Sequence, residues 1–268
     1  MKRLHILLLV VIGGITLLSW AGGPESSRLL PATASYSEQM SAVSGGRYSS
    51  QELFALLENP EAVSGLSPNQ ERAVLNEVMN KLRKIAAPDS DLEEAFMRVA
   101  SDSSRDPGVR EYAVQHLYLC HSTSENRDVV QEYLWKSAKD PILSTCAILQ
   151  LHHLGLKKGI TLSRPLAPVV FEAMQRENLR NADRATLLVV AAERGWTEAL
   201  PFAREWGINT GDQVVLRAVL TAIGKLGDVR DLEYLKELES RQNMQNLQKS
   251  IEFTRTSLTL EGIKDATQ

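Results

Sequence analysis

Both cysteines and four of the five histidines fall in one stretch of the chain, between residues 116 and 153. Thiolate and imidazole groups are the ligands that zinc prefers in proteins, and haem-type iron uses the same side chains. His116 and Cys120 are four residues apart and would share one face of a helix. The stretch is therefore a candidate metal site. The residues of the group are His116, Cys120, His121, Cys146, His152 and His153.

No signature of a common catalytic site accompanies this group. The chain has no Gly-x-Ser-x-Gly, His-Glu-x-x-His, Cys-x-x-Cys, Walker-type loop or Gly-x-Gly-x-x-Gly. Paired acids such as Glu93 and Glu94 are typical of solvated helix faces, and acid–base catalysis needs a cleft around a carboxylate. We therefore expect a protein that is not an enzyme and that needs no cofactor.

The composition favours an all-α protein with a substantial core. Hydrophobic residues make up 43% of the 268 residues and charged residues 24%, and few stretches alternate as strands do. Lys and Arg number 30 against 33 Asp and Glu, a formal charge of −3, and no block of like charge occurs. Nucleic acid is therefore not an expected partner.

The chain repeats one kind of helix start. Segments 106–113 and 140–147 each have Asp, then Pro, an aliphatic residue three positions after the Asp, and Ala seven after it; a weaker copy begins at Asp212. An Asp at the N-cap accepts hydrogen bonds from the first free N–H groups of a helix, and Pro is tolerated in the first turn. We expect a first helix after each Asp.

Glycines predict where these first helices end. Gly155, Gly195 and Gly227 each follow a helical stretch, and glycine commonly ends a helix in the left-handed conformation. The period is then helix, turn, helix. The expected second helices cover residues 91–100, 125–138, 163–176, 197–206 and 228–239.

Further helices are expected on both sides of these repeats. A short helix begins near residue 51 and ends at Asn59, before a proline. The next begins with a capping-box pattern of Ser67 and Gln70 and runs to Ile85. A final apolar stripe predicts a C-terminal capping helix. Its residues are Met244, Leu247, Ile251, Thr254 and Leu258.

The repeated segment resembles the HEAT-repeat family, whose first helices carry Asp-Pro-x-Val-Arg-x-x-Ala. Asp106, Pro107, Val109, Arg110 and Ala113 match it position by position. The later copies match in part, so the repeats are degenerate, and armadillo-like or other α-solenoid relatives are the alternatives. The resemblance implies a right-handed α-solenoid of about five to six helix-turn-helix repeats over residues 51–268, with a terminal cap.

The repeat register weakens the metal hypothesis. Cys120 lies 14 residues after its Asp, where the sister repeats have Leu154 and Leu226, so we expect a buried thiol. Cys146 lies only six residues after its Asp. The difference corresponds to roughly 12 Å of helix rise, which argues against a disulfide between the two cysteines.

The histidines also have a structural interpretation. His116 aligns with Gln150, a polar position, and His121 falls just past its helix. His152 and His153 reach nearly the height of the first cysteine, but equal height does not establish coordination. We prefer structural histidines, with a metal-binding or enzyme-associated role for His116, Cys120, His152 and His153 as the alternative.

Second helices usually line the concave surface of an α-solenoid, where partners dock. Trp135 lies about 100° around its helix from the core position Leu134, which would expose it. Trp206 lies beside Arg204 on a later second helix. We therefore predict Trp135, Arg204 and Trp206 as partner-binding residues; the alternative is that both tryptophans seal contacts between repeats.

Residues 1–21 have the layout of a secretory signal peptide. Lys2 and Arg3 precede an apolar run over residues 6–18, and small residues lead to a cleavage site after Ala21. An uncleaved anchor in the inner membrane is the alternative. The chain has no Asn-x-Ser/Thr sequon, which favours a bacterial export route to the periplasm or the exterior.

Residues 22–50 are rich in Ser, Gly and Pro and predict a flexible linker before the solenoid of residues 51–268. The expected function is an exported, non-enzymatic scaffold with a protein or peptide on its concave face. The sequence does not indicate which partner that is.

Overall fold

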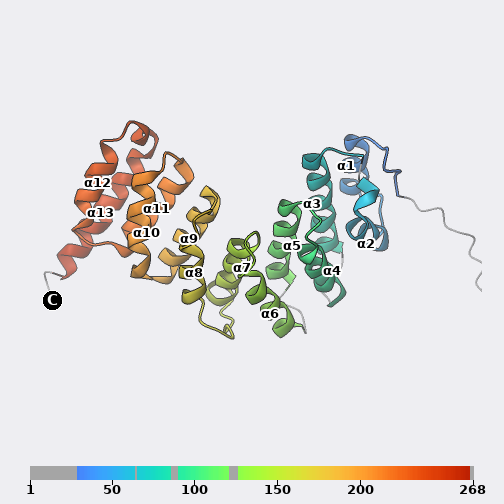
Figure 1. Cartoon of the computed structure of the whole chain (residues 1–268), viewed down its shortest axis with the longest axis horizontal. Coiled ribbons are helices and arrows are strands. Elements are labelled where there is room, and N and C mark those ends of the chain that lie inside the picture. The colour runs from blue at the N-terminus through green and yellow to red at the C-terminus, as the bar shows by residue number, and fades with distance from the viewer. Residues whose placement is uncertain (1–28, 64, 86–89, 121–125, 266–268) are drawn as a thin grey trace, which may run out of the picture.

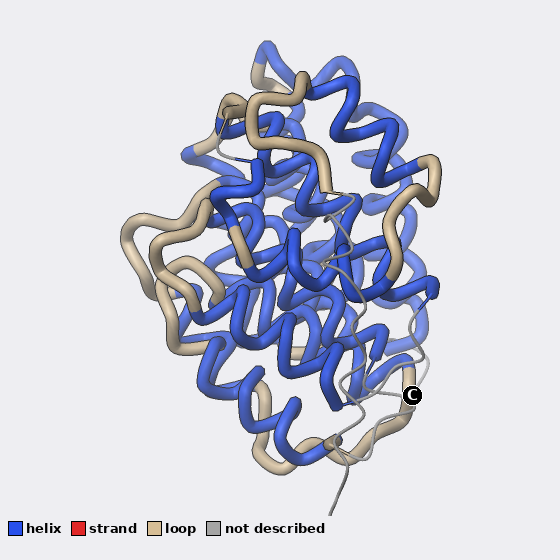
Figure 2. The backbone as a smooth tube through the Cα atoms, turned by 90° about the vertical axis from the view of Figure 1, so that its right-hand side faces the viewer, coloured by secondary structure: helices blue, strands red, loops and turns tan. Residues whose placement is uncertain are grey.

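The computed structural model describes residues 29–63, 65–85, 90–120 and 126–265. Within these ranges the regular structure is entirely helical, with thirteen α-helices packed together and no strand (Figures 1 and 2). The all-α prediction is confirmed. The predicted signal segment and His121 lie outside the described residues. No helix within the described ranges is both long and apolar enough to span a bilayer.

The helices follow one another along the long axis of the molecule (Figure 1). Their bounds are α1 Tyr36–Ser44, α2 Ser50–Glu58, α3 Pro68–Ile85, α4 Ser90–Ser101, α5 Pro107–Cys120, α6 Arg127–Ser137, α7 Ser144–Lys157, α8 Ala167–Met174, α9 Asn181–Arg194, α10 Leu200–Asn209, α11 Gln213–Leu226, α12 Asp231–Glu239 and α13 Gln248–Asp265. Short 3-10 helices cover Pro60–Val63, Thr197–Ala199 and Gln242–Leu247.

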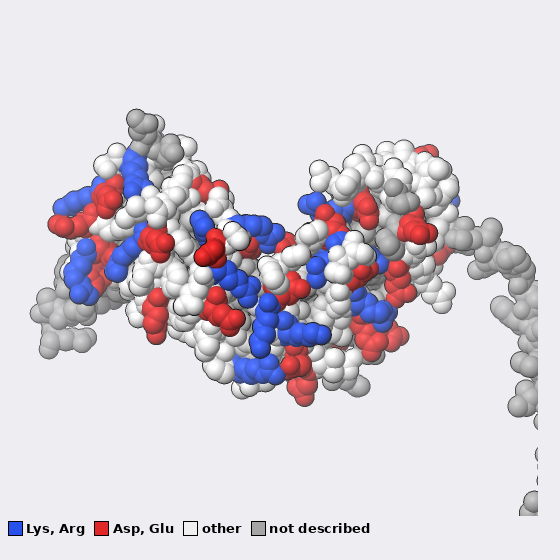
Figure 3. All heavy atoms as spheres, in the orientation of Figure 1, with Lys and Arg blue, Asp and Glu red and all other residues white. Residues whose placement is uncertain are grey.

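The first helices form a continuous layer, in which α3, α5, α7, α9, α11 and α13 each pack against the next. The second helices are more widely separated, since α6 packs closely on α7 but not on α4 or α8. The shorter layer of a curved array lies on the inside of the bend, so the first helices face inward. Figure 3 shows an indentation between the two ends of the molecule. In Figure 1, which has the same orientation, α6 and α8 lie along the edge of the molecule opposite this indentation. The expectation that second helices line the concave surface is therefore wrong.

The predicted Asp caps are present at the starts of α5 and α11, whereas Asp140 makes the same contacts in a turn and the N-cap of α7 is Leu143. In Asp106, Asp140 and Asp212, Oδ1 accepts the backbone N–H groups two and three residues later, at 2.8 to 3.3 Å. Two of these aspartates also join neighbouring first helices, because Arg72 donates to Asp106 at 3.1 Å and Arg110 donates to Asp140 at 3.4 Å. At Asp106 the cap thus fixes both the start of a helix and its alignment with the preceding one.

Glycine ends the helix at two of the three predicted positions, and only one of these two glycines is left-handed. Gly195 ends α9 with φ 72°, as expected. Gly227 ends α11 with φ −78° and ψ 175°, an extended conformation. Gly155 lies inside α7, which continues to Lys157. A Cβ at Gly155 would lie 2.7 Å from Nη2 of Arg194, so a close approach accounts for the glycine there.

Part of the predicted linker is helical instead. Ser35 and Glu38 form a capping box at the start of α1, and Ala42 and Val43 of this helix are buried. α1 packs on α3 and extends the array. The prediction of a flexible segment was wrong here because α1 has too few large apolar residues to show a helical period, although its capping box was readable.

The core is continuous from α1 to α13. The C-terminal stripe predicted from the sequence is buried throughout, with each of its five residues at most 2% exposed. Two large apolar residues of the same helix are not: Phe253 is 74% exposed and Leu260 is 56% exposed. α13 is thus more than a polar cap.

Candidate functional site

His116 lies in an aromatic cluster and is 3% exposed. Its ring centroid is 4.8 Å from that of Tyr112 and 5.2 Å from that of Phe96, and neither ring nitrogen has a hydrogen-bond partner among the described residues. Burial, assisted by the charge of Arg83, lowers the pKa of His116 to about 4. The side chain is therefore neutral at physiological pH and packs as an aromatic residue.

His152 joins two neighbouring first helices, α7 and α9. Its Nε2 is 2.8 Å from a carboxylate oxygen of Glu193, and Arg194 donates to its Nδ1 at 3.1 Å. Nδ1 thus accepts and Nε2 carries the proton, so both nitrogens are engaged. His153 is 3.1 Å from Nζ of Lys157 instead. The structure gives these histidines separate partners.

Cys146 has the character of a buried thiol. Its Sγ lies 3.3 Å from the carbonyl oxygen of Glu111, and burial raises its pKa to about 12. A thiol must ionise to bind a metal or to attack as a nucleophile, so this environment opposes both. Cys120 ends α5, and its side chain lies outside the description. The described side chains contain no group of three His, Cys, Asp or Glu residues arranged to hold a metal ion.

Trp135 and Trp206 are buried rather than exposed. Trp135 is 2% exposed and Trp206 is 8% exposed. The predicted core stripe of α6 was too narrow, because Gln131 and Trp135 are buried beside Leu134. The ring of Trp206 packs against Phe202. Both tryptophans belong to the buried core, so neither is exposed for a partner.

Arg204 has a structural partner. It donates to both carboxylate oxygens of Asp231, at 2.8 and 3.1 Å, and so joins α10 to α12. Asp231 is 2% exposed, so its charge depends on this arginine for compensation. The guanidinium of Arg204 is thus engaged within the molecule.

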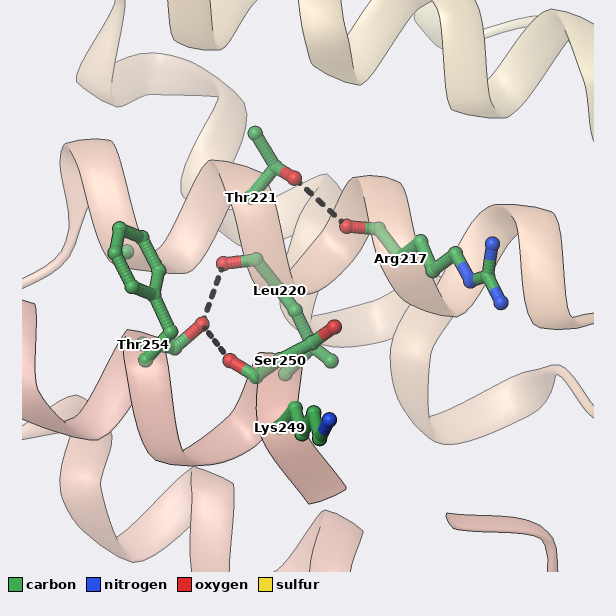
Figure 4. A pocket seen from close by; sticks show the side chains of 8 residues that line it. Arg217, Leu220, Thr221, Lys249, Ser250 and Thr254 are labelled. Carbon is green, nitrogen blue, oxygen red and sulfur yellow. Dashed lines mark hydrogen bonds between the residues drawn. The ribbon is translucent and has the colours of Figure 1, made fainter. Parts of the chain in front are cut away.

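A surface pocket of about 410 Å³ lies between α11 and α13 (Figure 4). Thr254 ties the two helices together below it, since its hydroxyl lies 2.8 Å from the carbonyl oxygen of Ser250 and 3.2 Å from that of Leu220. Gly224 adds no side chain to the floor of the pocket. A Cβ at this position would lie 3.4 Å from Cγ2 of Thr254. The charged ends of Arg217 and Lys249 lie on the side of the pocket away from Thr254 (Figure 4).

A second hollow of about 350 Å³ adjoins the first and shares Arg217 and Thr221 with it. It continues over α9 to Leu149 of α7. The two hollows lie on either side of Arg217 and Thr221 and together extend from α7 to α13, and we call the pair of hollows the α7–α13 groove. Its remaining lining comes mainly from Ala185, Thr186, Val189, Val214, Ala218, Lys249, Ser250 and Phe253.

The sequence carried a readable signal for this groove. Val214, Arg217, Ala218 and Thr221 have the i, i+3, i+4, i+7 spacing of one helix face, beside the core face of α11. The groove was missed because candidate binding residues were sought on second helices only.

No family model matches the chain, and neither the curated proteins nor the solved structures include a significant match. The geometry alone must therefore support any assignment of function.

Proposed function

We propose that this protein is an exported, non-enzymatic binding or scaffolding module, built as a degenerate HEAT-like α-solenoid. A recurring contact, in which each second helix packs on the first helix that follows it, supports the repeat architecture: α4 packs on α5, α6 on α7, α8 on α9 and α10 on α11. The Asp caps at the starts of α5 and α11 support it as well. Stacked helix pairs of this kind bury a shared core and leave one elongated surface for a partner.

The observation that carries the binding role is that two hollows adjoin along the first helices and share Arg217 and Thr221. Each of the two hollows falls within the range of pockets that hold ligands, and together they cross four helices. An elongated groove over successive repeats fits a protein or peptide better than a small molecule. The partner is therefore expected along the first helices, on the concave side.

A photo-crosslinking amino acid at Thr221 tests this proposal. Thr221 is exposed and lines both hollows, so irradiation of the protein in its native cells should yield a discrete adduct. Lys236 is an exposed position on α12, outside the groove, and is the matched control. Adducts from neither position, or the same adducts from both, would contradict a specific binding groove.

Export rests on the signal-like layout of residues 1–21. N-terminal sequencing of the purified protein is expected to begin at Gly22, after cleavage behind Ala21. A chain that keeps residues 1–21 and fractionates with membranes would instead indicate an anchor.

A further inference from the structure

We infer that the α7–α13 groove takes an acidic peptide segment of a partner protein, with an apolar side chain in the pocket between α11 and α13 and carboxylates at Arg217 and Lys249. This inference rests on the proposed function and specifies the chemistry of its partner.

The charge of the groove is opposite to that of the whole protein. Arg217 and Lys249 line it and no Asp or Glu does, although the chain carries a formal charge of −3. Neither cation forms an ion pair within the described part of the chain. Many other surface arginines do, as Arg180 does with Glu111 at 2.5 Å and Arg255 with Glu239 at 2.5 Å. The groove thus presents two cations that are available to an anionic partner.

The groove also has exposed apolar side chains, so its partner should carry apolar groups as well as anionic ones. Phe253 is 74% exposed and Val214 is 58% exposed, one at each hollow. Leu260 is 56% exposed and lies seven residues after Phe253, on the same face of α13. Covering such side chains removes apolar area from water, at about 25 cal/mol per Å². A free inorganic anion would leave this area uncovered, whereas a peptide with acidic and apolar residues covers it.

The small side chains of the groove floor leave room for the partner's own apolar residue. Gly224 adds no side chain to the pocket between α11 and α13, and Ala185 and Ala218 add little volume to the adjoining hollow. The hydroxyl of Thr221 is already satisfied by the carbonyl oxygen of Arg217 at 2.9 Å, so its methyl group is free to contact an apolar side chain. The floor is therefore suited to apolar contact, and the cations at its edge are suited to carboxylates.

Selection of a random 12-residue peptide library on the full-length protein tests the inference. Enriched peptides should combine Asp or Glu with a large apolar residue. A fluorescein-labelled synthetic copy of one such peptide should bind the double variant Arg217→Glu/Lys249→Glu at least about tenfold more weakly, because like charges then face each other. Raising the salt concentration should also weaken its binding to the unaltered protein.

The matched control is Lys139→Glu/Lys236→Glu, which makes the same change in net charge at two exposed positions outside the groove. It should bind the peptide as the unaltered protein does. Thr221→Trp fills both hollows and should abolish binding. Circular dichroism of each variant confirms that it is folded.

Three outcomes would overturn the inference. The selected peptides could lack acidic residues and bind the Glu double variant but not Thr221→Trp. That result would show that the groove binds peptides without the proposed preference for acidic residues. Equal loss in both double variants would assign the effect to net charge alone. Self-association that the groove variants abolish would identify a second copy of this chain as the occupant. Crosslinking at Thr221 reports on the binding function independently of these results.

Discussion

Among single residues, His116 combines deep burial with two ring nitrogens that lack hydrogen-bond partners within the described part of the chain. Its pKa of about 4 lies below the ordinary value of 6.5. Between these pH values the unfolded chain binds a proton at His116 and the folded chain does not. The stability of the folded state is therefore not reduced by His116 above pH 6.5, and it decreases as the pH falls from 6.5 toward 4.

His116→Met should remove this part of the pH dependence, because methionine has similar bulk and does not titrate. The free energy of unfolding of the unaltered protein should fall more between pH 7 and pH 4.5 than that of the variant, by up to about 3 kcal/mol. Urea denaturation followed by circular dichroism at both pH values measures the difference. Identical pH dependence of the two proteins would show that folding does not lower the pKa of His116.

Arg204 is assigned a structural role, in which it compensates the buried charge of Asp231, instead of a role in binding a partner. Arg204→Met should lower the free energy of unfolding by about 2 to 3 kcal/mol, because it leaves the buried Asp231 carboxylate uncompensated. Adding Asp231→Asn should restore part of the loss. The control is Arg230→Met, since Arg230 is 87% exposed in its pair with Asp228 and such pairs contribute under about 1 kcal/mol. A similar loss in both single variants would contradict the assignment.

At the scale of the element, α7 and α9 are joined by a contact that restricts the sequence of α7. Arg194 donates to both Nδ1 and the carbonyl oxygen of His152, each at 3.1 Å, and passes over Gly155 to do so. A glycine inside a helix usually costs about 1 kcal/mol relative to alanine. Here the glycine leaves space for the arginine that links two repeats.

Gly155→Ala should consequently fail to stabilise the protein, because its Cβ displaces Arg194 from His152. In an Arg194→Met background the same substitution should raise the free energy of unfolding by about 1 kcal/mol, the ordinary helix preference for alanine. A double-mutant cycle measured by urea denaturation tests this coupling. The same gain in both backgrounds would show that the close approach has no energetic effect.

At the scale of the whole molecule, an array in which each helix pair packs mainly on its neighbours should lose stability locally when one end is removed. Deleting residues 241–268 removes α13 and uncovers the faces of α11 and α12 that it buries. Hydrogen exchange should then accelerate in α11 and α12 and remain slow in α3 and α5. Loss of protection along the entire chain would indicate one cooperative domain instead of a repeat array.

Local signals in the sequence determined the all-α class, most helix positions and several caps. Asp106 and Asp212 start their helices through hydrogen bonds to residues two and three positions away, so nothing distant is needed to predict them. The buried stripe of α13 followed in the same way from helical spacing. The capping box of α1 was equally local, and the composition around it concealed the helix.

Tertiary structure alone decided which faces meet and which stay open. Trp135 is buried because α6 packs with a wider face than its apolar stripe indicates. Gly155 lies under the side chain of Arg194, which is 39 residues away in the sequence. The α7–α13 groove exists because successive first helices lie side by side on the inside of the bend, and that depends on the relative spacing of two layers. Such spacing results from the sum of many contacts between distant residues, so the sequence showed the repeat while the packed molecule showed the surface on which a partner is proposed to bind.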